Sequence, residues 1–419
     1  MPEAQKQKEA KRRSIRAVEA SNFFLADVQT GLGPFLAAYL ASNGWNAGDV
    51  GVALTLSGLV TVVVQTPAGA LVDRVRAKRT ILAAGVAVLT CGALLLARNH
   101  DRPFVYTAQV LIGSASPFLA PTLAAITMGL VGQRGFDRQF GKNQSFNAAG
   151  NVAAAVGIAA VSRAFGNQAI FILTAALGVP TVLALAAIRG DQIDNDAASG
   201  GRAATSASRS ESIASLASDR VLVLFLCCVF LFHFANAAML PQLGEMLAKG
   251  SARNAAPFMS ACVIVTQLVI TGSAGWIGRY ANIHGRKLLL LVGFSVLPFR
   301  AVFYTMTHWT PALISIQILD GVANAIFTVV SVLVIADRTR GTGRFNLAQG
   351  ALATAVGIGA SLSTTFGGKI TQYFGFRISF LALGAVAALA FLLLLLGVPE
   401  TLPPETETPG TPASRVAPA

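Results

Sequence analysis

The sequence predicts an all-α integral membrane protein whose helices cross the bilayer many times. Of its 419 residues, 54% are hydrophobic and 12% are charged, and the mean hydropathy is +0.61. Because soluble domains contain about 25% charged residues, this composition excludes an ordinary soluble fold. Apolar runs near twenty residues, the length that crosses the hydrocarbon layer as a helix, recur along the whole chain.

Twelve apolar runs can be placed, and a polar segment divides them into two sets of six. The expected spans are residues 18–41, 48–72, 80–98, 104–131, 144–164, 168–189, 219–247, 255–279, 288–307, 311–336, 346–370 and 377–398. The segment between the sets is rich in Asp, Ser, Ala and Gly, which is a linker composition. The predicted parts are an N-terminal arm (1–17), an N-terminal six-helix bundle (18–189), a linker (190–218), a C-terminal six-helix bundle (219–398) and a disordered tail (399–419).

The distribution of Lys and Arg predicts the orientation in the membrane. The arm, the tail and the segments after every second span carry 24 of these residues, whereas the opposite ends of the spans carry seven. Since cytoplasmic segments retain positive charge, both termini and the linker are expected in the cytoplasm. The net charge of +13 lies mainly in these short segments, and no basic face with interleaved aromatic residues appears. The sequence therefore argues against a nucleic-acid partner.

The two halves of the chain resemble each other. The segment Gln109–Ala115 in the fourth span is similar to Gln317–Ala323 in the tenth. In the fifth and eleventh spans, Ala155–Ile158 and Ala355–Ile358 share the sequence Ala-Val-Gly-Ile. A duplicated six-span unit with a polar linker is the plan of a transporter whose halves rock about a site between them.

The turn between the second and third spans carries a recognisable pattern. Gly69, Asp73, Arg74 and Lys78 follow the spacing Gly-x-x-x-Asp-Arg-x-x-x-Lys. This spacing resembles the cytoplasmic loop between helices 2 and 3 of the major facilitator superfamily, although two intervening positions depart from the family's preference. The resemblance implies a gating loop in which Gly69 allows close helix packing and Asp73 faces the positive end of another helix. The alternative is an ordinary positive-inside loop.

Two further patterns resemble a bacterial subgroup of the same family, of the drug and metabolite type. They are Asn147-x-x-Gly150-Asn151 at the start of the fifth span and the segment Thr339–Asn346 before the eleventh. The resemblance implies a multi-pass protein of the bacterial inner membrane. Two features of drug/proton antiporters are missing, because Gln109 stands where they carry an Arg and the fifth span has no Gly-Pro pair.

Two titratable residues inside predicted spans are candidates for carrying protons. Asp27 lies in the first span and His233 near the middle of the seventh, and the family resemblance implies that both spans line a central cavity. Charged groups in membrane helices are costly and mark functional sites by default. The alternatives are a hydrogen-bonded helix-packing role for Asp27 and a structural histidine at 233.

Arg300 and Asp320 form a second candidate pair. Counted from the same side of the membrane, each lies about 12–14 Å deep at 1.5 Å per residue, so the two charges can meet. A structural ion pair is expected because neither charge is tolerable alone. The alternative is that Arg300 binds a substrate anion.

Polar amides recur within the spans and supply donors and acceptors for a substrate cavity. The alternative role for any one of them is to join helices through hydrogen bonds. The candidate cavity residues are Gln29, Gln109, Asn147, Asn236, Gln317, Asn324 and Gln349.

The predicted function is secondary active transport of a small organic solute by alternating access, coupled to protons, with efflux favoured over uptake. The alternatives are a non-transporting receptor or scaffold with this fold and a proton-coupled uptake symporter. No clustered nucleophile, carboxylate pair, metal-ligand set or phosphate-binding loop is visible, so neither an enzyme nor a cofactor is expected. The four cysteines show neither a disulfide framework nor metal spacing, and a monomer is expected.

Overall fold

The computed structural model describes residues 3–30, 32–198, 218–339 and 345–402. Within these ranges every regular element is a helix, and ten helices are long and apolar enough to cross a membrane. Helices suit this environment because they satisfy their own backbone N–H and C=O groups without water. The predicted all-α membrane fold is confirmed, whereas the number of twelve spans stays a prediction.

The N-terminal half begins with a long helix that crosses the predicted boundary between arm and first span. Its elements are α1 (Glu3–Thr30), α2 (Leu32–Ser42), α3 (Ala47–Arg74), α4 (Lys78–Arg98), α5 (Arg102–Phe165), α6 (Ala169–Ala187), η1 (Gly190–Gln192) and α7 (Asn195–Ala198). The expected fourth and fifth spans both lie in α5. They are separated at Gly132, whose φ of 69° a residue with a side chain rarely adopts.

The C-terminal half repeats this plan. Its elements are α9 (Arg220–Asn236), α10 (Met239–Gly250), α11 (Ala252–His284), α12 (Arg286–Met306), α13 (Thr310–Thr339) and α14 (Phe345–Gly397). The expected eleventh and twelfth spans both lie in α14 and are separated at Gly375, with φ of 82°. The predicted seventh span is broken into α9 and α10, because Pro241 has no N–H to donate to the carbonyl of Ala237.

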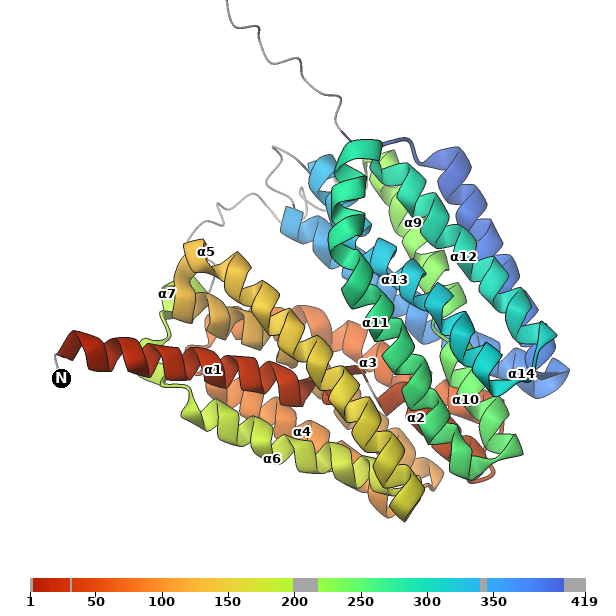
Figure 1. Cartoon of the computed structure of the whole chain (residues 1–419), viewed down its shortest axis with the longest axis horizontal. Coiled ribbons are helices and arrows are strands. Elements are labelled where there is room, and N and C mark those ends of the chain that lie inside the picture. The colour runs from red at the N-terminus through yellow and green to blue at the C-terminus, as the bar shows by residue number, and fades with distance from the viewer. Residues whose placement is uncertain (1–2, 31, 199–217, 340–344, 403–419) are drawn as a thin grey trace, which may run out of the picture.

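Each half has its own apolar core, and a third core joins the halves. One cluster of buried residues lies between Ala17 and Ala198, and a second between Leu222 and Val398. The third includes Phe35 of α2 together with residues of α10 and α11. In Figure 1 the two groups of helices meet around α2 and α10 and spread apart toward their opposite ends.

The spreading defines two ends of the molecule. We call the end that carries residues 190–198 the linker end, and the opposite end, with turns at Gly44, Gly166 and Gly375, the far end. The halves are in contact at the far end through the packing of α2 on α10 and of α3 on α14.

Glycines set the close approach of α3 to α14. A Cβ added at Gly51 or Gly58 would collide with residues of α14, and one added at Gly357 of α14 would collide with Val62. Nearer the linker end, a Cβ added at Gly69 would meet no atom of a described neighbouring residue within 4 Å. The close packing predicted at Gly69 is therefore wrong for this conformation, because the two helices separate before they reach it.

Hydroxyl groups complete the contact between α3 and α14. Thr55 Oγ1 donates to the carbonyl of Ser361 at 2.6 Å and lies 2.8 Å and 2.7 Å from the hydroxyls of Thr364 and Thr365. Among the described residues, every ion pair joins two residues of the same half. The described contacts that hold the far end closed are therefore apolar packing and uncharged hydrogen bonds.

At the linker end, a basic side chain closes the equivalent turn in each half. Lys78, 1% exposed, donates from Nζ to the carbonyl of Val72 at 2.9 Å, near the end of α3. Arg286 donates from Nη1 to the carbonyl of Ala281 near the end of α11, and its Nε pairs with Asp337 at 3.1 Å. Positive charge at a helix C-terminus offsets the partial negative charge of the unpaired carbonyls.

The start of the tail is fixed to the same end. Glu400 accepts the backbone N–H groups of Arg286 at 2.8 Å and Lys287 at 3.0 Å, which are the first two residues of α12. Burial acts to raise the pKa of Glu400, but four backbone N–H donors outweigh burial and leave that pKa below its usual value. The first residues after α14 thus cap α12.

The glycine contacts predict that Gly51→Ala destabilises this conformation. The new methyl group would press on the backbone carbonyl of Thr364, which cannot rotate away, and such overpacking costs about 1–3 kcal/mol. We expect a lower Tm. We also expect greater labelling of a cysteine introduced at the far end, such as Asn43→Cys. The matched control is Gly69→Ala, where space is open, and equal losses in the two variants would contradict the predicted contact.

Candidate functional site

A cavity of about 510 Å³ lies between the two halves and is the candidate substrate site. From the N-terminal half it is lined by Gly33, Pro34, Leu54, Ser57, Gly58, Thr61, Gln109, Ile112 and Ser116. From the C-terminal half it is lined by Asn236, Ala237, Leu240, Pro241, Arg300, Asp320, Ala360, Ser361 and Thr364. Its volume suits a small organic molecule.

The cavity wall combines apolar side chains with hydroxyl groups. Thr61 donates its hydroxyl proton to the carbonyl of Gly113 at 3.1 Å, and Ser116 donates to the carbonyl of Ile112 at 2.7 Å. Each hydroxyl oxygen keeps lone pairs that can accept a further hydrogen bond. These groups can therefore orient a polar solute without carrying charge.

Arg300 is the centre of the polar wall contributed by the C-terminal half. The residue is 0% exposed, and its Nη1 donates to Asp320 Oδ1 at 2.7 Å and to Asn236 Oδ1. Its Nε donates to Tyr304 Oη at 2.9 Å, and its Nη2 to Gln317 Oε1 at 3.3 Å. The ion pair expected from the matched depths of Arg300 and Asp320 is present.

The carboxylate of Asp320 is held from two further directions. Its Oδ1 accepts the side-chain N–H of Asn324 at 3.0 Å, one turn along α13. Its Oδ2 accepts the hydroxyl of Thr266 from α11 at 3.3 Å. Because both charges are buried and extensively hydrogen-bonded, the pair satisfies the condition under which buried ions are tolerated.

Gln109 lines the same cavity as Arg300 and Asp320 and is the candidate recognition residue of the N-terminal half. It lies on α5, is 3% exposed and lines the cavity. Within the described ranges its side chain makes no hydrogen bond to another residue. Its amide can therefore offer a donor and an acceptor to a solute.

The structure places only some of the seven predicted cavity amides at the central cavity. Gln109 and Asn236 line the central cavity, whereas Gln317 and Asn324 belong to the network around Arg300 and Asp320. Asn147 lines a separate pocket of about 350 Å³ within the N-terminal half, where its side chain donates to the carbonyl of Asn22 at 3.4 Å.

The other two amides are not brought to the central cavity by the described contacts. Gln349 lies half-buried in α14 and lines none of the described pockets. Gln29 lies in α1, and its side chain is outside the described residues.

Of the two predicted proton carriers, the structure describes the side chain of His233 but not that of Asp27. Asp27 lies in α1, but its side chain is outside the described residues. The His233 ring packs edge-on to Phe327, with centroids 4.6 Å apart, and beside Phe232. Its buried Nε2 has no hydrogen-bond partner in the described part of the chain, and the residue does not line the central cavity.

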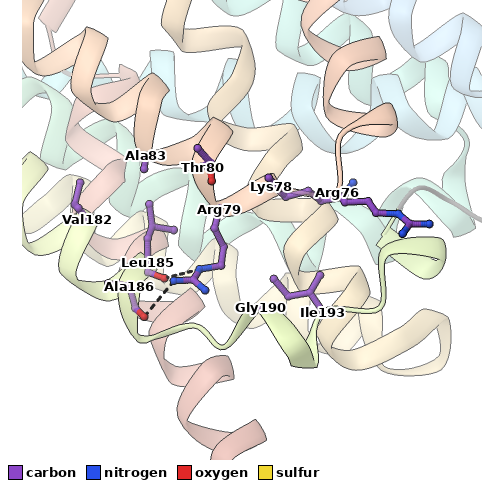
Figure 2. Close-up of a pocket in the computed structure, with 11 residues that line it drawn as sticks. Arg76, Lys78, Arg79, Thr80, Ala83, Val182, Leu185, Ala186, Gly190 and Ile193 are labelled. Atoms are coloured by element: carbon purple, nitrogen blue, oxygen red, sulfur yellow. Dashed lines mark hydrogen bonds between the residues drawn. The ribbon is translucent and has the colours of Figure 1, made fainter.

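The turn between α3 and α4 borders a second depression at the linker end. Figure 2 shows this pocket of about 460 Å³ with Arg76, Lys78 and Arg79 on the α4 side and residues of α6 opposite. Arg79 donates to the carbonyls of Leu185 at 3.2 Å and Ala186 at 3.3 Å, which caps the end of α6.

The contacts made by this turn join helices of the same half. Arg74 is exposed, and the side chain of Asp73 is outside the described residues. The gating role of Gly69, Asp73, Arg74 and Lys78 therefore stays a prediction.

Tyr304 and Glu245 are among the buried polar-group residues that sequence reasoning missed. Tyr304 accepts hydrogen bonds from both Arg300 and Gln317, and its position one turn after Arg300 on α12 was the available signal. Glu245 was placed two residues from the end of the predicted seventh span. In the structure α10 continues to Gly250, and Glu245 is 3% exposed.

Similarity to known proteins identifies the family. The family model of the Major Facilitator Superfamily matches residues 20–297 and 268–418. The chain belongs to the major facilitator superfamily. It is 40% identical over 396 residues to uncharacterised MFS-type transporters of two Mycobacterium tuberculosis strains, CDC 1551 / Oshkosh and ATCC 25618 / H37Rv, covering 93% of this chain and 94% of each relative.

Solved structures share the major facilitator fold with this chain. The nucleoside transporter NupG matches with a TM-score of 0.76 and 14% identity, covering 92% of this chain and 98% of that one. A D-xylose–proton symporter matches with a TM-score of 0.70 and 12% identity, covering 93% and 98%. At these identities the likeness concerns the fold alone.

The buried pair of this major facilitator predicts coupled effects of mutation. Asp320→Asn leaves the Arg300 charge without its counter-ion, and breaking such a pair costs about 3–5 kcal/mol. The double variant Arg300→Gln with Asp320→Asn should recover part of the lost folded yield, measured by size-exclusion chromatography in detergent. A double variant that loses as much as the sum of the single variants would show that the charges do not interact.

Proposed function

We propose that this major facilitator moves a small, uncharged organic solute rich in hydroxyl or amide groups by alternating access, coupled to protons. The observation that carries the proposal is the cavity of about 510 Å³ between the halves, whose mainly apolar wall carries hydroxyl and amide groups, next to a closed far end. In this conformation the cavity is reached from the linker end, and access from the far end, by separation of α2 from α10 and of α3 from α14, is the complementary half of the cycle.

The lining supports an uncharged solute. Arg300 and Asp320 are the charged residues among the described lining side chains, and they neutralise each other at 2.7 Å. A charged solute would enter without an unpaired counter-charge to compensate for its lost hydration. Hydroxyl and amide groups of a neutral solute instead match the free amide of Gln109 and the hydroxyls of the wall.

The arrangement of the ends supports an inward-facing state. Contacts between α3 and α14 extend from the far end to Gly357, and open space begins before Gly69 and Gly350. With the linker end in the cytoplasm, as the asymmetry of Lys and Arg predicts, the cavity here would exchange solute with the cytoplasm. The direction of net transport then depends on the coupling gradient.

Gln109→Ala tests the proposed binding site. A thermal-shift screen of neutral metabolites and drugs on the purified protein would first identify a ligand. We expect the variant to bind this ligand about tenfold more weakly, since one hydrogen bond to a solute is worth about 1–1.5 kcal/mol. Gln349→Ala, outside the cavity, is the matched control. Equal affinity of the Gln109 variant and the parent protein would place recognition elsewhere.

Asp27→Asn tests proton coupling. Asparagine keeps the size of the side chain but cannot release a proton, so the variant should exchange solute between liposomes and medium at equilibrium without concentrating it under a pH gradient. Asp191→Asn, an exposed acid at the linker end, is the control. Normal accumulation by the Asp27 variant would remove this residue from the mechanism. Binding without any flux in the parent protein would favour the receptor alternative, and the sign of accumulation distinguishes efflux from uptake.

A further inference from the structure

We propose that Glu245 is a proton-operated latch of the far-end gate, protonated while α2 and α10 are in contact and ionised when they separate. This inference rests on the alternating access proposed above. It concerns the gate and its pH dependence, and it is independent of the identity of the solute.

The first observation is the burial of an unpartnered carboxyl group. Glu245 is 3% exposed, and its Oε2 is buried without a hydrogen-bond partner in the described part of the chain. An ionised carboxylate in such a place would lose its hydration, and the charge of Lys249, which makes no ion pair with it, would compensate only in part. Proton uptake removes most of this cost, so the closed far end favours the neutral acid.

The second observation is the position of Glu245 at the contact between the halves. Residues three and four apart lie on one face of a helix, so Glu245 shares a face of α10 with Pro241 and Ala248. Pro241 lines the central cavity, and Ala248 packs with Ala38 of α2 in a small buried cluster. Glu245 thus lies about 6 Å along the helix from a cavity residue, beside the surface that must part when the far end opens.

The charged groups around α10 leave the carboxyl group without an ion pair among the described residues. Lys249, one turn further along α10, places its ammonium 5.0 Å from the centroid of the Phe376 ring. On α2, Tyr39 is the titratable side chain, and its ring packs against Phe171 of α6.

The remaining helices packed against α10 are α9, α11 and α14. Their titratable side chains near this end are His233, which is packed against Phe327, the exposed Arg253, the buried thiol of Cys262, Lys369 beside Gly48 of α3, and the exposed Tyr373 and Arg377. None of them forms an ion pair with Glu245 within the described ranges.

The sign of the pH effect follows from where the proton binds more tightly. Separation of α2 and α10 admits water to Glu245, which can then release its proton to the far-side solution. Because the closed form holds this proton more tightly than the open form, acid favours the closed far end and alkali favours the open one.

The test measures the gate directly, without a solute. In a background with Cys91, Cys227, Cys228 and Cys262 replaced by Ala, spin labels on Asn43→Cys and His308→Cys report the distance between the halves at the far end. For the parent protein in nanodiscs, we expect one short distance at pH 5 and a growing long-distance population up to pH 9. Glu245→Gln should lose this shift and stay at the short distance at every pH.

Control variants distinguish the effect of losing the Glu245 carboxyl group from the effects of changing another acid and of misfolding. Glu19→Gln changes a carboxylate that already accepts a hydrogen bond from Gln139 at 2.9 Å, and should keep the parent response. Glu245→Asp keeps a carboxyl group and should shift the midpoint of the transition, which decides the matter if Glu245→Gln does not fold. A pH-independent parent protein, an unchanged response in Glu245→Gln, or an unshifted midpoint in Glu245→Asp would overturn the proposal.

Discussion

Every charge inside the bundle must be neutralised where it lies, and the structure depends on this constraint most strongly at Arg300. Its guanidinium bonds to residues of α9, α12 and α13, and Asp320 extends the network to α11. Four helices of one half are thereby fixed to one another by hydrogen-bonded groups. Removing any one of these groups would leave a buried charge or polar atom unpaired. The result is a rigid, electrically neutral wall, against which the other half can move without exposing a bare charge.

The contact between the halves has the opposite character. Glycines at Gly51 and Gly58 bring the backbone of α3 close to α14, and short hydroxyl side chains such as Thr55 fill the contact. Such surfaces separate without leaving buried ions behind, and their hydroxyl groups can turn to other partners. The molecule thus combines strong polar bonds inside a half with weaker, exchangeable contacts between halves, which is what rocking about a central cavity requires.

Much of this architecture follows from composition and spacing, and the remainder depends on three-dimensional packing. Depth along two helices was enough to pair Arg300 with Asp320, because an isolated charge is excluded from the bilayer. Neither the part of Tyr304 in that network nor the separate pocket of Asn147 could be read from spacing, since both depend on helix rotation. The burial of Glu245 was not predicted because the expected span ended at residue 247, which placed this acid near the membrane surface. The end of an apolar run is poorly defined by hydropathy.

The uncharged far-end contact has a consequence for the response of the protein to its surroundings. Salt weakens attraction between ions over a Debye length of about 8 Å at 0.15 M, but it has little effect on hydroxyl-to-carbonyl bonds such as that between Thr55 and Ser361. A contact closed by such bonds keeps its balance of closed and open forms when the ionic strength of the solution at the far end rises or falls.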